Sequence, residues 1–86
     1  MKYELFKIVT KEGKETFVIT DSYEKASAIF SSYNVPAEGE YFLCQIFWWS
    51  EELDREQRMK LGDLLEFGPE GIAEYDKDSG WSVHPG

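Results

Sequence analysis

The stretch KYELFKIVTKEGKETFVIT, residues 2–20, consists of two runs of β-branched and aromatic residues on either side of the tripeptide EGK. Runs of this composition favour strands. Gly13 can adopt the left-handed backbone conformation that a short hairpin turn requires. The stretch therefore predicts a β-hairpin, with strands at residues 2–10 and 15–20.

After this hairpin the apolar pattern changes to a helical period. Asp21 or Ser22 can cap a helix, with Glu24 placed as in a capping box. The apolar residues that follow fall on one helical face; they are Tyr23, Ala26, Ile29, Phe30 and Tyr33. We expect Asn34 and Pro36 to end this helix.

The most apolar segment, EYFLCQIFWW at residues 40–49, predicts a third strand. Neighbouring side chains in a strand point to opposite faces. One face would carry Phe42, Cys44, Ile46 and Trp48, and the other Tyr41, Leu43, Gln45, Phe47 and Trp49. The first set has no polar member, so we expect it to pack against the helices. Trp48 would then be a core residue, and Trp49 would be exposed or only partly covered.

A second helix is expected to begin at Ser50 and to end in the sequence FGPEG, residues 67–71. Gly62 should weaken or bend this helix. Its buried stripe would consist of Leu53, Leu61, Leu64 and Leu65. Residues 72–76 and 81–83 can form a final hairpin across KDSG, and we expect residues 83–86 to fray.

The predicted order of elements is ββαβα, with a final ββ hairpin as an option. This order predicts an α+β fold in a small single domain spanning residues 1–86. We expect a mostly antiparallel sheet with two helices on one face.

Residues suited to catalysis or metal binding are scarce. His84 and Cys44 are the only residues of their types, whereas a structural zinc site needs four such ligands. The acids of DKDSG, residues 76–80, begin like a calcium loop, but Trp81 stands where that loop needs glycine. No phosphate loop or dinucleotide fingerprint is present. We therefore predict no catalytic residue, no metal site and no cofactor.

The formal charge of −8 is concentrated in the second half of the chain, where residues 51–86 hold four basic residues against ten acids. Negative charge disfavours direct contact with nucleic acid or with an anionic membrane. It is compatible with a protein partner that has a basic surface. The N-terminal MKYELFKIV lacks the long apolar stretch of a signal peptide, and no run is long enough to span a membrane. We expect a cytoplasmic protein.

The candidate binding site joins Trp49 to the nearby acids Glu51, Glu52 and Asp54, because interface hot spots often combine an aromatic anchor with charge. The sequence thus predicts a small acidic, non-catalytic protein–protein interaction module. It would act as an inhibitor or modulator that blocks a basic surface of a partner such as a nucleic-acid-processing enzyme. Small size and acidity are similar to those of phage or plasmid inhibitors of the anti-defence type, but no motif identifies a family.

Two other functions stay open. A small-ligand-binding sensor or regulatory domain would be favoured by a pocket larger than about 300 Å³. An obligate homo-oligomeric structural protein would use an exposed apolar strand face as its subunit interface. The acids could also serve only to keep an aromatic-rich domain in solution.

Overall fold

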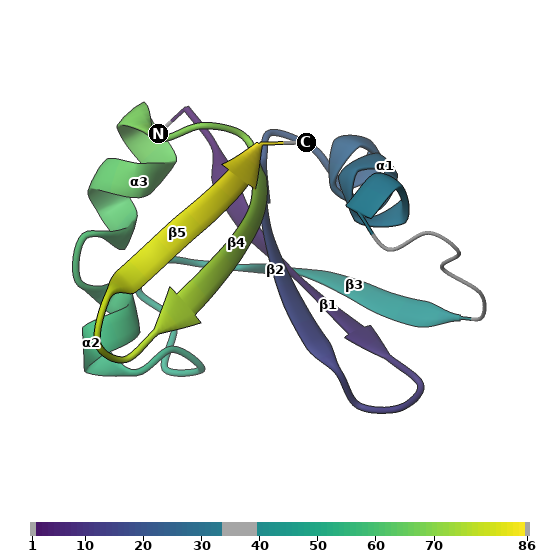
Figure 1. Cartoon of the computed structure of the whole chain (residues 1–86), viewed down its shortest axis with the longest axis horizontal. Coiled ribbons are helices and arrows are strands. Elements are labelled where there is room, and N and C mark those ends of the chain that lie inside the picture. The colour runs from purple at the N-terminus through teal and green to yellow at the C-terminus, as the bar shows by residue number, and fades with distance from the viewer. Residues whose placement is uncertain (1, 34–39, 86) are drawn as a thin grey trace.

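A five-stranded antiparallel sheet forms the middle of the molecule, with its strands in the order β3-β1-β2-β4-β5 (Figure 1). The structure is a computed structural model and describes residues 2–33 and 40–85. The strands are β1 (Glu4–Thr10), β2 (Glu15–Thr20), β3 (Tyr41–Ile46), β4 (Gly71–Asp76) and β5 (Gly80–Pro85), and the helices are α1 (Tyr23–Tyr33), α2 (Arg55–Arg58) and α3 (Leu61–Phe67). The predicted α+β class, the antiparallel sheet and the final hairpin are confirmed.

The hairpin of β1 and β2 lies at the centre of this sheet. Gly13 takes a φ of 85°, and its N–H donates to the carbonyl oxygen of Thr10 at 2.9 Å. The expected left-handed turn is therefore present. On its other side β2 pairs with β4 only along a short ladder, which joins Phe17, Val18 and Ile19 to Ala73, Ile72 and Gly71.

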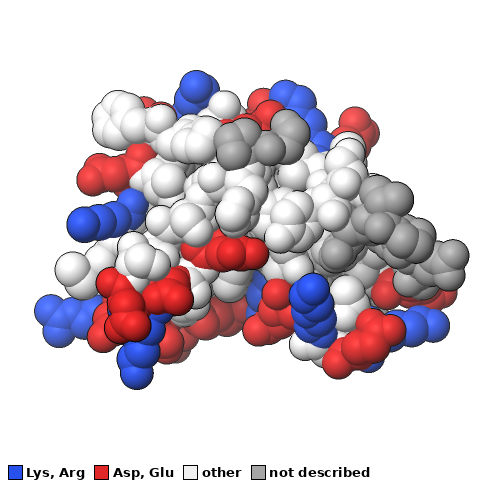
Figure 2. All heavy atoms as spheres, in the orientation of Figure 1, with Lys and Arg blue, Asp and Glu red and all other residues white. Residues whose placement is uncertain are grey.

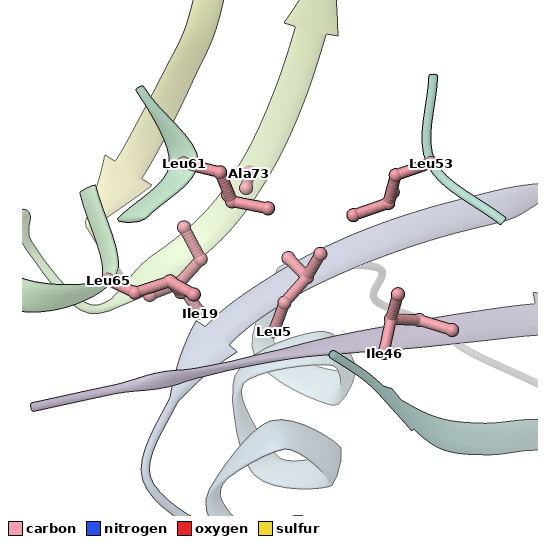
Figure 3. Close-up of a cluster of buried hydrophobic side chains, with 7 residues drawn as sticks. All are labelled: Leu5, Ile19, Ile46, Leu53, Leu61, Leu65 and Ala73. Atoms are coloured by element: carbon pink, nitrogen blue, oxygen red, sulfur yellow. The ribbon is translucent and has the colours of Figure 1, made fainter. Parts of the chain in front are cut away.

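Both faces of the sheet are covered. One cluster, on the face that α1 covers, consists of Phe6, Ile8, Val18, Ala26, Phe30 and Ile72. The other, shown in Figure 3, consists of Leu5, Ile19, Ile46, Leu53, Leu61, Leu65 and Ala73. This corrects the expected placement of both helices on one face. The reason lies in adjacent apolar pairs such as Leu5–Phe6 and Val18–Ile19, which send a buried side chain to each face.

The face of β3 that we expected to be the less buried one, with Tyr41 and Leu43, packs against the α1 cluster. Tyr41 packs edge-on against Phe30 of α1, with ring centroids 5.0 Å apart, and Leu43 packs against the same cluster. Phe42 is 77% exposed, and Cys44 is exposed too. Of the set expected in the core, only Ile46 is buried within the strand. The cause is the position of the helices, because the cluster around α3 extends along β3 only as far as Ile46.

The single second helix expected from the sequence is two short helices. Lys60 adopts a left-handed conformation, with φ 65°, and separates α2 from α3. The interruption therefore falls before Gly62, where we expected the weakness. Leu61 and Leu65, one helical turn apart, can then both face the sheet. Ser50 does not cap α2, because that helix begins only at Arg55; the Ser50 hydroxyl instead accepts the N–H of Glu52 at 3.2 Å.

The start of α1 and the end of β5 can also be compared with the boundaries expected from the sequence. The hydroxyl oxygen of Ser22 accepts a hydrogen bond from the N–H of Lys25 and so caps α1. The expected stop at Asn34 and Pro36 lies outside the described residues. β5 pairs along its length with β4, including Gly71 with Pro85, so residues 83–85, where we expected fraying, belong to a strand. Among the described helices, none has both the length and the apolar character needed to cross a membrane.

In the turn between β4 and β5, Asp76 acts as a hydrogen-bond acceptor. It is the first acid of the DKDSG segment, whose start is similar to a calcium loop. The Asp76 carboxylate accepts the N–H of Asp78 at 2.7 Å and that of Ser79 at 3.2 Å. These backbone hydrogen bonds hold the pKa of Asp76 below its usual value of 3.8. A carboxyl group with a lowered pKa in the folded state stabilises the fold above its unfolded pKa, and this contribution is lost as the pH falls through the folded pKa.

We therefore expect Asp76→Ala to lower the melting temperature near neutral pH and to have a much smaller effect at a pH below the lowered pKa of the folded state, where the carboxyl group is protonated in both states. Thermal denaturation monitored by circular dichroism measures both differences. Asp78→Ala removes the same charge from the same turn but not the acceptor, so it serves as the control. An equal loss for Asp76→Ala at both pH values would contradict this role.

Candidate functional site

The chain leaves the sheet at Ile46 and turns sharply, and this turn carries three consecutive aromatic side chains. Phe47 is 51% exposed, Trp48 40% and Trp49 58%. A hydrogen bond of 2.9 Å from the N–H of Ser50 to the carbonyl oxygen of Phe47 closes the turn. We call residues 47–49 the aromatic turn.

Contacts with Trp49 hold the rings of the aromatic turn in place. Phe47 and Trp49 stack with centroids 4.8 Å apart, and Trp48 meets Trp49 edge-on at 5.9 Å. Beside the rings lies a hollow of about 300 Å³. Its remaining lining residues are Tyr3, Glu4, Leu5, Gln45, Ile46 and Leu65. The site thus presents packed aromatic surface next to a shallow depression at one end of β1 and β3.

The expected exposure of Trp49 is confirmed, but the prediction that Trp48 is a core residue is wrong. Our prediction assumed that the alternation of side chains in a strand continues as far as Trp49, whereas β3 ends at Ile46. In a turn, neighbouring side chains need not alternate between a buried and an exposed face. Phe47 was not predicted as a site residue. The signal for it was present in the run of three aromatic residues directly before Ser50 and two acids.

The three acids of the predicted site have different environments. Glu51 is exposed and makes no hydrogen bond or ion pair within the part of the chain that the structure describes. Asp54 is the N-cap residue of α2, and its N–H donates to the side-chain oxygen of Gln57 at 2.9 Å. Glu52 pairs with Lys7. The structure therefore leaves Glu51 free beside Trp49 and gives Glu52 and Asp54 internal contacts.

Lys7 lies between two carboxylates on the α3 side of the sheet. Its Nζ is 3.3 Å from Glu15 Oε1 and 3.3 Å from Glu52 Oε2, and its side chain is only 20% exposed. Burial lowers the pKa of Lys7, but hydrogen bonds and attraction from Glu15 and Glu52 outweigh burial and raise it above 10.5. Glu52 thus holds the segment after the aromatic turn against β1.

A second surface, not predicted from the sequence, is a groove of about 850 Å³ between α2–α3 and the β4–β5 hairpin. Trp81 and Tyr75 form part of its wall, with ring centroids 5.4 Å apart. The groove is open to solvent, and its lining residues Met59 and Phe67 are 59% and 81% exposed. The sequence did not reveal it because its lining combines two segments that are distant along the chain.

Charged side chains do not gather into one acidic field on the face that Figure 2 shows. That face is mostly uncharged over β4 and β5, and acidic and basic side chains are intermixed along its lower edge. The groove likewise mixes both signs, with Glu56, Asp63 and Asp78 beside Lys60 and Lys77.

The only histidine is part of a small surface cluster. His84 Nε2 lies 3.4 Å from Glu74 Oε2, and its ring stacks on Tyr33 at a centroid distance of 6.4 Å. The Tyr33 hydroxyl donates to Glu74 Oε1 at 3.4 Å, so the cluster ties the end of α1 to β4 and β5. Within residues 2–33 and 40–85, no three His, Cys, Asp or Glu side chains are grouped so that they could hold a metal ion.

Comparisons of the chain with protein-family models, with curated proteins and with solved structures gave no match.

Proposed function

We propose that this protein is a non-catalytic interaction module that binds another protein through the aromatic turn. The observation that carries the proposal is the exposure of three contacting aromatic side chains at one point of a small domain. Single exposed apolar residues are ordinary, but a contiguous group of them marks an interaction surface.

The contacts among the three rings favour tight binding of a partner, because they hold the rings in place before binding. The rings of Phe47 and Trp48 each already contact Trp49, so little side-chain entropy is lost when a partner covers them. Tryptophan is also enriched among the residues whose truncation costs most at interfaces. The neighbouring hollow gives a protruding apolar side chain of the partner a place to bind.

The charge of the chain favours a partner with a basic surface. The net charge of −8 would accelerate encounter with such a surface, and the exposed Glu51, two residues after Trp49, has no partner among the described residues and can pair with a partner cation. Glu52 and Asp54 have internal roles, so we assign the direct contact to the aromatic turn and Glu51. By covering a basic surface the protein would inhibit or modulate its partner, and a cytosolic enzyme that acts on nucleic acid fits this description.

The test begins with a partner recovered by pull-down from the host cell and continues with purified components. Trp49→Ala is expected to raise the off-rate about tenfold or more, because an anchor acts mainly after docking. Glu51→Lys is expected to lower the on-rate about two- to fivefold, with a smaller effect as salt rises, since exposed charges are screened. Surface plasmon resonance at low and high salt measures both rates.

Two control variants match these changes elsewhere on the molecule. Phe67→Ala removes another exposed aromatic ring, and Glu12→Lys makes the same charge reversal beyond the opposite end of β1. Neither should change the kinetics strongly. If Phe67→Ala weakened binding while Trp49→Ala did not, the groove would replace the aromatic turn as the site.

A second candidate function, a small-ligand-binding regulatory domain, is favoured by the volume of the groove between α2–α3 and the last hairpin. An NMR screen of small molecules would support this function if the shifted amides were confined to residues around Tyr75 and Trp81. Shifts confined to the aromatic turn would argue against it.

A further inference from the structure

β3 is an edge strand of the sheet, and no strand among the described residues pairs with its outer side. Within the described residues it pairs only with β1. Edge strands in natural proteins are usually protected by lysine, proline, a bulge or a covering segment. The sequence of β3, YFLCQI, contains neither lysine nor proline. Its register with β1 runs from Leu5–Ile46 to Thr10–Tyr41 without a skipped residue, so it contains no bulge.

The exposed side chains of β3 are apolar as well. Phe42 is 77% exposed, and Cys44, which lies on the same face two residues further on, is exposed. Opposite Phe42 on β1 is the half-buried Val9. The α3-side cluster covers the Ile46 end of this face and leaves the Phe42 end open.

The other edge of the sheet, β5, differs in the chemistry of its exposed side chains. Ser82 and His84 are exposed in the part of that strand whose burial is described, and its paired region ends at Pro85. Both exposed side chains are polar, and proline is a common edge-protecting residue. β3 is therefore the edge at which pairing would also bury apolar side chains.

Two properties of that edge, its lack of charge and its self-complementary backbone, suit a second copy of this chain as the occupant. Two copies that each carry −8 repel one another over most of their surfaces. Residues 41–46 carry no formal charge, so two copies can approach there with the least repulsion. An antiparallel edge is also complementary to itself, because its outward N–H and C=O groups match those of an identical strand turned by a two-fold rotation.

We propose that β3 pairs antiparallel with β3 of a second copy, which joins the two sheets into one of ten strands. The two-fold axis must stand perpendicular to the sheet, so residues that face each other across the new pair lie on the same face. Phe42 of each copy then meets Cys44 or Ile46 of the other. Because the shared strand is short, the dimer is weak and forms at high protein concentration.

The pairing goes beyond the proposed function and does not depend on it. Each aromatic turn directly follows β3, so the dimer would carry the two turns at opposite ends of the shared strand pair. A partner with two binding surfaces would then be held at both ends, which raises the overall affinity without a new contact.

The test is sedimentation velocity over a concentration series. The 10.0-kDa chain is expected to shift toward twice its mass as concentration rises. Phe42→Lys is expected to raise the dimer dissociation constant at least about tenfold, because it places a charge at the shared edge. The matched control Ser82→Lys adds the same charge to an exposed position of β5 and should leave dimerisation unchanged.

A second measurement uses the single cysteine. Either position of the two-fold axis, at Leu43 or at Cys44, brings the two Cys44 residues within about 10 Å by strand geometry. A short bismaleimide should therefore cross-link the wild-type dimer and fail to cross-link Phe42→Lys at the same concentration. A chain that stays monomeric at all concentrations, a dimer that Ser82→Lys disrupts, or a dimer without the Cys44 cross-link would each overturn the proposal.

Discussion

Phe6→Ala is expected to lower the free energy of unfolding by about 3–5 kcal/mol, as large aromatic truncations in cores do. Phe6 is 1% exposed and lies on the inner strand β1, where it joins the cluster under α1. Its ring meets Tyr23 edge-on at 5.0 Å, so its loss leaves a cavity between the sheet and the first turn of α1. The loss is a large fraction of the stability typical of a domain of this size.

Trp48→Ala is the variant whose free energy of unfolding should be compared with that of Phe6→Ala. Trp48 is the larger residue, yet 40% of its surface is exposed in a turn, so its truncation should cost no more than about 1–2 kcal/mol. Urea denaturation followed by circular dichroism measures both variants. If Trp48→Ala were the more destabilising of the two, the aromatic turn would be buried in the folded protein, and the surface proposed for partner binding would not exist.

The second large effect concerns Trp81 on β5. Its indole N–H donates to the carbonyl oxygen of Gln57 in α2 at 2.6 Å, and its ring meets those of Phe17 and Tyr75, each at 5.4 Å. Trp81→Ala removes both kinds of interaction and is expected to cost about 3 kcal/mol or more. It should loosen the last hairpin from α2 in particular.

Trp81→Phe separates the two contributions. Phenylalanine keeps an aromatic ring against Phe17 and Tyr75 but cannot donate to Gln57, so the expected cost is about 1–2 kcal/mol. Thermal and chemical denaturation of both variants give the comparison. Equal costs for the two substitutions would show that the hydrogen bond, rather than the packing, fastens the hairpin; a negligible cost for both would contradict the contact itself.

The elements of the fold that depend on local sequence were predictable. The EGK turn requires a left-handed glycine, and Gly13 has that conformation. The helical spacing after Ser22 likewise identified α1, because its buried residues Ala26 and Phe30 are four apart. The final hairpin followed from two short strands around KDSG.

The errors arose where tertiary packing decides between local alternatives. The pattern of β3 is compatible with either face pointing to a helix, and only the position of α1 puts Tyr41 and Leu43 inward. Likewise, lysine does not favour the left-handed conformation that Lys60 adopts, so the sequence did not predict it. The adjacent apolar pairs Leu5–Phe6 and Val18–Ile19 did carry the information that both faces need cover, and they were the signal that we did not use.

The same limit applies to the candidate site. The exposure of Trp49 was predictable from its neighbourhood in the sequence, as was the nearness of Glu51, because the two residues are only two positions apart. The internal role of Glu52 was not predictable, because its partner Lys7 lies on β1 and meets it only in the folded chain. The groove beside Trp81 also combines segments that are distant in sequence.

The short ladder between β2 and β4 has an energetic consequence. Its two strands are separated along the chain by residues 21–70, so joining them carries the largest loop-closure entropy of any neighbouring pair in the sheet. Yet its paired length, Phe17–Ile19 against Gly71–Ala73, is shorter than that of either ladder of β1. Backbone pairing alone is therefore a weak link at this point. The free energy that closes the sheet there must come mainly from side chains on its two faces, above all Ile72 beneath α1 and Trp81 against Phe17.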